Sequence, residues 1–310
     1  MIKRRVGEQF WLVRQPDHAQ SAAFLAAHWG NGEFARPGQF NAPSSAEYWR
    51  DQTIFAIAEH DNGWWEWEAN PAIDPDDHLP LDFLEIGKNR SMAHWRIGTN
   101  RFAESHPFAA LLICLHSRLL YESVRDDPVQ PQLIPPLMAG DGSGMPSGGE
   151  PDELRDFVAE QKELESKLLE RATEAAATET TDLGNEELIK RYPKRGIPPD
   201  LPLRQDDFLM PHVRLLQIAD SLSLTLCRGG AGPRTIDQVP RRSWEDRVTL
   251  ELEYRDGHGL ALSPYPFDQD PLKVSIPAWI IPAARPAHDS FLTWSYQNQR
   301  QLISFQLSSA

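Results

Sequence analysis

The feature that most constrains the fold is a set of polar side chains placed inside apolar helical patterns. His60 and Asp61 follow the apolar run TIFAIA, residues 53–58, shortly before Gly63. Asp220 lies in the run LLQIADSLSL, with apolar residues on both sides. A carboxylate buried without a partner costs several kcal/mol, so Asp220 needs a cation, a metal ion or a set of hydrogen bonds. The fold has to bring that partner from another part of the chain.

The length and composition indicate a folded globular protein with one large core. The chain has 310 residues, of which 40% are hydrophobic and 10 are tryptophan, so it can bury a sizeable core. It contains no apolar run close to the roughly 18 residues of a membrane span. The basic start MIKRRV is followed by only a short apolar stretch before Arg14, which argues against an export signal. Cys114 and Cys227 lie in leucine-rich runs and are expected as buried thiols in a reducing cytoplasm.

The charge balance restricts the class of partner. A formal net charge of −14 repels phosphate backbones at long range, so we expect no nucleic-acid partner. A small phosphorylated ligand remains compatible with this charge if metal ions supply local positive charge. The sequence also lacks a phosphate-binding GxxxxGK[ST] loop, a GxSxG nucleophile motif and paired CxxC motifs.

Helical periodicity and helix-ending residues predict most of the organisation. The expected helices cover residues 16–29, 45–60, 91–103, 106–121, 151–178 and 211–228. The residues 64–90, which begin with WWEWE, are expected to wrap the core as an irregular segment. A loop rich in Pro and Gly is expected at 126–150, where the composition is typical of disorder.

The character of the chain changes after about residue 240. The segments VTLELEY, GLALSPYPF, LKVSIPAWII, FLTWSYQ and LISFQL predict strands, with RDGHG as a hairpin turn. We therefore expect a mainly α protein. Its helical domain would span residues 1–235, and a β-rich C-terminal appendage, residues 236–310, would pack on the core.

The order of the polar residues resembles the signature of the HD-domain superfamily of metal-dependent phosphohydrolases. That signature is a His, then an adjacent His-Asp pair, then a distant Asp. Here His18, followed by Ala22 and Leu25, is similar to its first motif; FAIAEHDNGW and LLQIADSLSLTL resemble the second and the last. The resemblance covers residues 14–228. The segments AIAEHDNGWWEWE and SHPFAALLICLHSRLLY also resemble a bacterial domain family of unknown function related to HD proteins.

The resemblance implies an HD-type helical bundle and a metal site. His18, His60, Asp61 and Asp220 would hold one or two divalent ions, Mn, Fe, Mg or Zn, with Asp61 as the bridge between two ions. Nitrogen and carboxylate ligands suit such metals, and a metal-bound water of lowered pKa can attack phosphorus. Asp61 is thus a candidate catalytic residue.

Two further histidines extend the candidate metal set. SHPFAALL is similar to the His-Pro helix start of the two-metal HD relatives, which makes His106 a candidate ligand. A position at a helix N-terminus disfavours the protonated imidazole and keeps the ring available. His116 is another candidate, although it lies about 15 Å further along the helix axis and cannot share one ion with His106 from this helix. The stretch DGSGMP, residues 141–146, resembles DGSGYP of the HD-GYP phosphodiesterases. The paired histidines and glutamate that should precede it are replaced by PPLMAG, so a cyclic-dinucleotide substrate is not expected.

Other residues have both a functional and a structural interpretation. Trp64 and Trp65 can stack on a base or sugar, or pack a loop onto the core. Arg96 and Arg101 can clamp a phosphate, or serve as solvated surface charges. Glu59 can act as a general base or point to water.

The sequence therefore predicts a metal-dependent phosphohydrolase that acts on a small phosphorylated or nucleotide-like molecule. Two alternatives remain open. The six candidate ligands also fit a di-iron oxygenase with the same fold. The polar cluster can also be a staple between helices in a binding module without catalysis.

Overall fold

The structure is a computed structural model in which all residues are described except 41–45, 126–150, 183–205, 230–233, 256–257 and 285–290. The helical elements are α1 (Gln15–Ala27), α2 (Ala46–Ala58), the 3-10 turn η1 (Asn62–Trp64), α3 (Trp65–Ala69), α4 (Lys88–Arg101), α5 (Pro107–Arg125), α6 (Pro151–Asp182), α8 (Asp206–Arg228) and α9 (Phe291–Gln297). The strands are β1 (Ile2–Val6), β2 (Gln9–Val13), β3 (Arg234–Pro240), β4 (Arg247–Arg255), β5 (Gly259–Ser263), β6 (Leu272–Pro282) and β7 (Gln301–Ser309). The expected loop at 126–150, with its DGSGMP stretch, lies outside the described residues.

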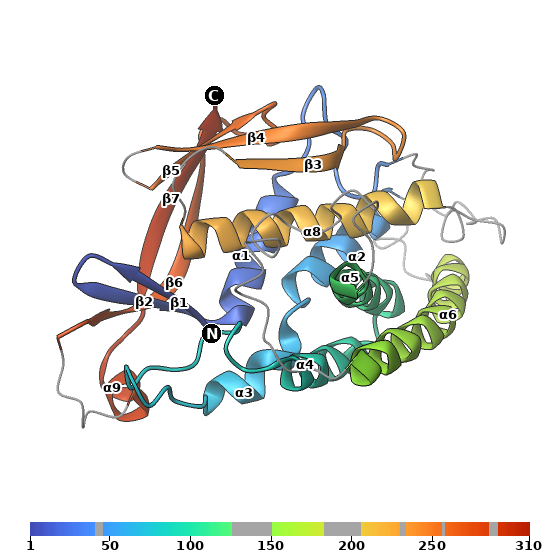
Figure 1. Ribbon diagram of the computed structural model, residues 1–310. Helices are drawn as coiled ribbons and strands as arrows, with labels where there is room; N and C mark the ends of the chain where they lie inside the picture. The colour runs from blue at the N-terminus through green and yellow to red at the C-terminus, as the bar shows by residue number, and fades with distance from the viewer. Residues whose placement is uncertain (41–45, 126–150, 183–205, 230–233, 256–257, 285–290) are drawn as a thin grey trace.

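Strands from both ends of the chain form one seven-stranded sheet in the order β1-β2-β6-β7-β5-β4-β3. The β5–β7 pair is parallel and the other neighbouring pairs are antiparallel. β1 and β2 form a hairpin whose turn holds Gly7 at a φ of 57°, a left-handed conformation that suits glycine. Figure 1 shows the sheet curling around one side of the helices, with α8 running beneath β3 and β4.

The prediction of a mainly α protein is wrong, because the protein is a mixed α/β fold. The N-terminal strands β1 and β2 have only five residues each, and they are completed by pairing with β6 from the far end of the chain. Such a long-range pairing leaves no local periodic signal. The segment FLTWSYQ, predicted as a strand, is instead the helix α9. The sheet thus combines residues from both sides of the division expected near residue 235.

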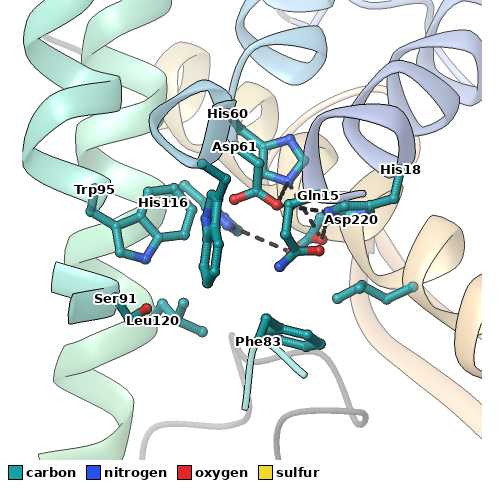
Figure 2. Close-up of a pocket in the computed structure, with 12 residues that line it drawn as sticks. Gln15, His18, His60, Asp61, Phe83, Ser91, Trp95, His116, Leu120 and Asp220 are labelled. Carbon is teal, nitrogen blue, oxygen red and sulfur yellow. Dashed lines mark hydrogen bonds and ion pairs between the residues drawn. The ribbon is translucent and has the colours of Figure 1, made fainter. Parts of the chain in front are cut away.

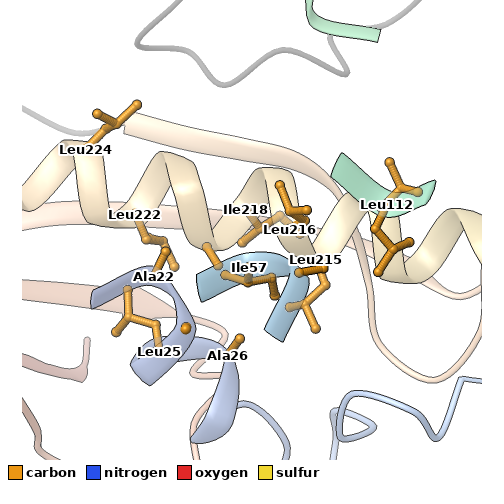
Figure 3. Close-up of a cluster of buried hydrophobic side chains, with 14 of the residues drawn as sticks. Ala22, Leu25, Ala26, Ile57, Leu112, Leu215, Leu216, Ile218, Leu222 and Leu224 are labelled. Atoms are coloured by element: carbon orange, nitrogen blue, oxygen red, sulfur yellow. The ribbon is translucent and has the colours of Figure 1, made fainter. Parts of the chain in front are cut away.

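The core is centred on α8, which contacts α1, α2 and α5 as well as β1 and β3. Figure 3 shows how its leucine and isoleucine side chains meet those of the neighbouring helices, among them Leu25 of α1, Ile57 of α2 and Leu112 of α5. The same buried cluster includes Ile2 of β1 and Leu307 of β7. Each fully buried aliphatic side chain contributes about 1.5–3 kcal/mol. Most of the helices and strands therefore share one hydrophobic cluster, and a smaller second cluster joins Leu12 of β2, Ile281 of β6 and Phe291 of α9.

The structure agrees with the expected absence of a membrane-spanning helix among the described residues and with the expected burial of both cysteines. Among the described residues, no helix combines the length and the apolar character that crossing a bilayer requires. Cys114 and Cys227 are free and buried. Burial raises the pKa of the Cys114 thiol to about 12, so this thiol stays protonated at neutral pH.

Candidate metal centre

Five polar side chains converge where α1, α2, α5 and α8 meet (Figure 2). They are His18 of α1, His60 and Asp61 directly after α2, His116 of α5 and Asp220 of α8. Each of these residues is at most 6% exposed. The four helices contact one another in the pairs α1–α8, α1–α2, α2–α5 and α5–α8, so helix packing itself brings the five residues together.

The end of α2 is shaped by the residues that follow the His-Asp pair. The Asn62 side-chain amide donates to the Glu59 carbonyl at 2.6 Å and to the Gly98 carbonyl of α4 at 3.1 Å. Gly63 approaches α4 so closely that a Cβ at this position would lie 1.9 Å from the His94 carbonyl oxygen. Only glycine permits this approach. The chain therefore turns against α4 and leaves His60 and Asp61 pointing into the interior.

The first group of donors consists of His18, His60 and Asp61, whose ligand atoms lie within 4.8 Å of one another. His18 Nε2 is 2.8 Å from Asp61 Oδ2, and His60 Nε2 is 3.6 Å from the same oxygen. The rings of His18 and His60 meet edge to face with centroids 5.1 Å apart. Two nitrogens and one oxygen thus face a common point.

The second group shares His60 and adds His116 and Asp220, again with ligand atoms within 4.8 Å. Asp220 Oδ1 is 3.6 Å from His60 Nε2 and 3.8 Å from His18 Nε2. Its other oxygen, Oδ2, is 3.6 Å from His116 Nε2. Asp220 therefore directs one oxygen to each side. The two groups overlap at His60 and provide positions for one ion or two.

Hydrogen bonds fix the orientation of two of the rings. His60 Nδ1 lies 2.8 Å from the Ile57 carbonyl oxygen, so Nδ1 carries the proton and donates it. Its Nε2 has no hydrogen-bond partner among the described residues, and 3.6 Å to each carboxylate is too long for a hydrogen bond. His18 Nδ1 is 2.7 Å from the Ser223 hydroxyl. Such outer contacts are the usual way in which proteins orient a metal-binding imidazole.

Without a metal ion, protonated histidine offsets the negative charge of the two carboxylates. Burial on its own lowers the pKa of His60, but the carboxylates of Asp61 and Asp220 outweigh it and raise this pKa to about 9. Burial on its own raises the pKa of Asp61, but His60 and His18 bring it down to about 2. The Asp220 pKa is lowered in the same way. Burial lowers the pKa of His116 to about 4, so this ring is neutral. In the metal-free protein, protons on histidine supply the positive charge.

The donor set fits a divalent transition metal. Three imidazoles with two carboxylates suit Mn, Fe or Zn, whereas Mg prefers oxygen ligands and water. His60 Nε2 is buried without a hydrogen-bond partner among the described residues, and a metal ion that takes the place of its proton would satisfy it. The five side chains line a cavity of about 40 Å³. A buried water needs roughly 10–15 Å³ by this measure, so the cavity has room for a few small species.

Of the two additional histidines predicted as ligands, only His116 lies in the cluster. His116 belongs to the second donor group. His106 precedes α5 and lies outside both groups; it stacks on Phe55 with ring centroids 4.3 Å apart and contacts the Ser105 hydroxyl at 3.0 Å. Because the two histidines are ten residues apart on α5 and its N-terminus, only one of them reaches the cluster.

Of the tryptophan and glutamate candidates, only Trp64 lines the cavity. Trp64 is 3% exposed and lines the cavity. Trp65 is 42% exposed and carries the Arg14 guanidinium 5.2 Å from its ring centroid, so it lies on the surface. Glu59 is half-buried, burial raises its pKa, and it is not among the residues that line the cavity.

The two candidate arginines are engaged elsewhere. Arg96 Nε lies 2.7 Å from Glu160 of α6. Arg101 donates to the Asn62 carbonyl at 3.0 Å and pairs with Glu66 at 2.5 Å. Neither arginine lines the cavity. Arg101 instead holds the turn after the His-Asp pair.

Sequence reasoning missed several residues of the site. Gln15, Ser91 and Trp95 line the cavity, and Ser223 contacts His18. Gln15 lies three residues before His18, a spacing that places both on one helix face, and Ser223 follows Asp220 by three residues in the same way. This spacing is the signal that would have found both. Trp95 has no such signal, because it reaches the site through the packing of α4.

Comparison with known proteins gives one match. The family model described as "Protein of unknown function (DUF3891)" matches residues 1–283. No curated protein and no solved structure matches the chain. The resemblance to the HD-domain superfamily is therefore wrong: the comparisons give no evidence for it, and a seven-stranded sheet is not part of a helical bundle. Spaced His and Asp residues indicate a cluster of donors, which more than one fold can assemble. Because the match covers most of its length, the chain belongs to the DUF3891 family.

Proposed function

We propose that the protein is a metal-dependent hydrolase that acts on a small phosphorylated substrate. One or two divalent ions would be held by His18, His60, Asp61, His116 and Asp220. The observation that carries the proposal is the pair of overlapping donor groups, buried around a cavity and joined by His60. A buried cluster with two carboxylates is costly to a protein unless a cation compensates it. A bound metal ion would compensate the charge of the two carboxylates and could take part in hydrolysis.

The residues of the chain would set up the reaction in three ways. A divalent ion supplies a water of lowered pKa and neutralises negative charge on the phosphoryl oxygens. His60 donates from Nδ1 to the Ile57 carbonyl, which orients the ring so that Nε2, once it has lost its proton, would face the ion. Asp61 Oδ2 and Asp220 Oδ1 each lie 3.6 Å from His60 Nε2, and together they would fix the position of the positive charge. Trp64 and Trp95 line the cavity and would limit the access of bulk water.

The test begins with the elemental analysis of protein purified without added metal. Phosphate release from p-nitrophenyl phosphate and bis(p-nitrophenyl) phosphate is then measured with added Mn²⁺, Zn²⁺ or Fe²⁺. We expect bound metal and metal-dependent release, both lost in His60→Ala and Asp220→Ala. His106→Ala is the matched control, because this histidine lies outside both donor groups. A protein that binds no metal and releases no phosphate would leave the cluster as a staple between helices.

A redox reaction at the same centre is a second candidate. The observation that favours it is the character of the cavity wall, in which Trp64, Phe83 and Trp95 are prominent and no described lining residue is Lys or Arg. Such a wall suits an uncharged substrate, and imidazole with carboxylate ligands suits iron. Iron in the purified protein, with oxygen uptake and without phosphate release, would select this candidate.

A further inference from the structure

Gln15 is a polar residue that lines the cavity but does not belong to the five candidate metal ligands. It begins α1, three residues before His18, and is 3% exposed. Residues three apart on a helix share a face, so Gln15 lies on the cavity side of α1 as His18 does. Figure 2 shows its carboxamide between the donor cluster and Phe83.

The Gln15 backbone is anchored, while its side-chain oxygen has no hydrogen-bond partner among the described residues. The backbone N–H donates to Glu68 Oε2 at 2.9 Å, and Glu68 is itself buried. The side-chain oxygen Oε1 is buried and has no hydrogen-bond partner among the described residues. An unsatisfied buried polar group is destabilising, and a bound ligand is one way to satisfy it.

The chemistry of the carboxamide matches an oxygen-rich group. It has two N–H donors and one acceptor oxygen, and it turns easily about its terminal bond. It can therefore donate to a phosphoryl oxygen through Nε2 and accept from a protonated oxygen through Oε1. It does so without adding charge next to the metal ligands.

The remainder of the wall offers little else for a phosphate. Apart from the five donors and Gln15, the cavity is lined by Trp64, Phe83, Ser91, Trp95, Leu120 and Leu224. None of these described residues is a lysine or an arginine, the side chains that commonly bind phosphate. Any phosphoryl oxygen not bound to metal has to find a neutral donor.

We propose that Gln15 binds the phosphoryl oxygen that is not held by metal, in the place that a basic side chain would otherwise take. The inference rests on the proposed function, because it assumes a phosphate-type substrate. It adds that the substrate is recognised by Gln15, whose side chain carries no charge.

The test is a calorimetric titration of the Mn²⁺-loaded protein with inorganic phosphate. Gln15→Met keeps the length of the side chain and removes its hydrogen bonds. We expect it to weaken phosphate binding about 10-fold or more, the usual loss for one hydrogen bond to a charged group, while metal content stays unchanged. Gln301→Met, an exposed position on β7, is the matched control and should bind phosphate as the wild type does.

Three outcomes would overturn the inference: equal phosphate affinity in Gln15→Met, loss of its metal, or no phosphate binding by the loaded wild type. If Gln15→Met does not fold, Gln15→Glu carries the test, because its carboxylate has the same size and should repel phosphate. Ester hydrolysis is followed on the same samples. Hydrolysis with unchanged phosphate affinity would refute only the role of Gln15. Phosphate bound through Gln15 without any hydrolysis would refute only the proposed function.

Discussion

His18 Nε2 lies 2.8 Å from Asp61 Oδ2, although the two residues are 43 positions apart in the chain. The other ring nitrogen, Nδ1, is 2.7 Å from the Ser223 hydroxyl, which itself donates to the Asp220 carbonyl oxygen. The contact is favourable when a proton lies between the ring nitrogen and the carboxylate oxygen, and a metal ion bound by both atoms would take the place of that proton.

The two histidines near α5 should differ in their effect on metal binding. We expect His116→Ala to lower the metal content of the purified protein by up to one ion, because it removes a ligand of the second donor group. His106→Ala should leave the metal content unchanged, since this ring stacks on Phe55. Elemental analysis of both variants provides the check. Equal metal loss in the two would contradict the assignment of the second group.

Removal of metal should destabilise the fold. A ligand that binds only the folded state adds about 2.7 kcal/mol of stability at a concentration of about 100 times its Kd. We expect the thermal unfolding midpoint to fall when a chelator is added and to return with Mn²⁺ or Zn²⁺. In the His60→Ala, Asp61→Ala double variant, the chelator should have no effect. An identical midpoint for wild type with and without chelator would argue against a bound metal.

The metal-free protein should lose stability as the pH rises above neutrality. The pKa of His60 is raised from 6.5 to about 9, so its protonated form stabilises the fold fully below the lower value. This contribution is lost as the pH rises through the higher value. The pKa of Asp61 is lowered from 3.8 to about 2, so its contribution is present above the first value and is lost only in strong acid. Urea unfolding at about pH 7.5 and about pH 9 should give a lower midpoint at the higher pH, because His116 and His212, whose pKa values are lowered to about 4, are neutral in the folded and unfolded states over this range.

Metal binding should show the opposite dependence on pH. Because His60 has to lose its Nε2 proton to act as a ligand, metal affinity should increase from about pH 6 to about pH 9. Binding at neutral pH should also release protons, which calorimetry in buffers of different ionisation enthalpy measures. Binding without proton release would contradict a role for His60 as a ligand.

Gly63→Ala should be strongly destabilising. A Cβ at Gly63 would lie 1.9 Å from the His94 carbonyl oxygen, and this backbone atom cannot move aside without shifting α4. We expect a loss of at least about 2 kcal/mol in the free energy of unfolding, together with reduced metal content, because the His-Asp pair would be displaced. Gly32→Ala is the matched control, since nothing lies within 4 Å of its added Cβ. The control should change stability by no more than about 0.5 kcal/mol.

The extent of the helices could be predicted from local sequence. The helix expected at 16–29 is α1, Gln15–Ala27, and the one expected at 45–60 is α2, Ala46–Ala58. The apolar spacing, Pro16 at the helix start and the glycine after each helix are local signals, and they act within a few residues. Some of the donors could also be predicted from local sequence. Asp220 lies among leucine and isoleucine residues, so its burial and its need for a partner are evident without knowledge of how the helix packs.

The tertiary structure decided what local signals do not contain. It joined β1 and β2 to β6 in one sheet, which made the protein mixed α/β. It brought His116 into the cluster while leaving His106 against Phe55, and it turned the Gln15 side chain toward the cavity. Such outcomes depend on the distances and angles at which separate segments pack. The sequence by itself determined which polar side chains lie within apolar helical patterns, and the packing of α1, α2, α5 and α8 determined which of them come together.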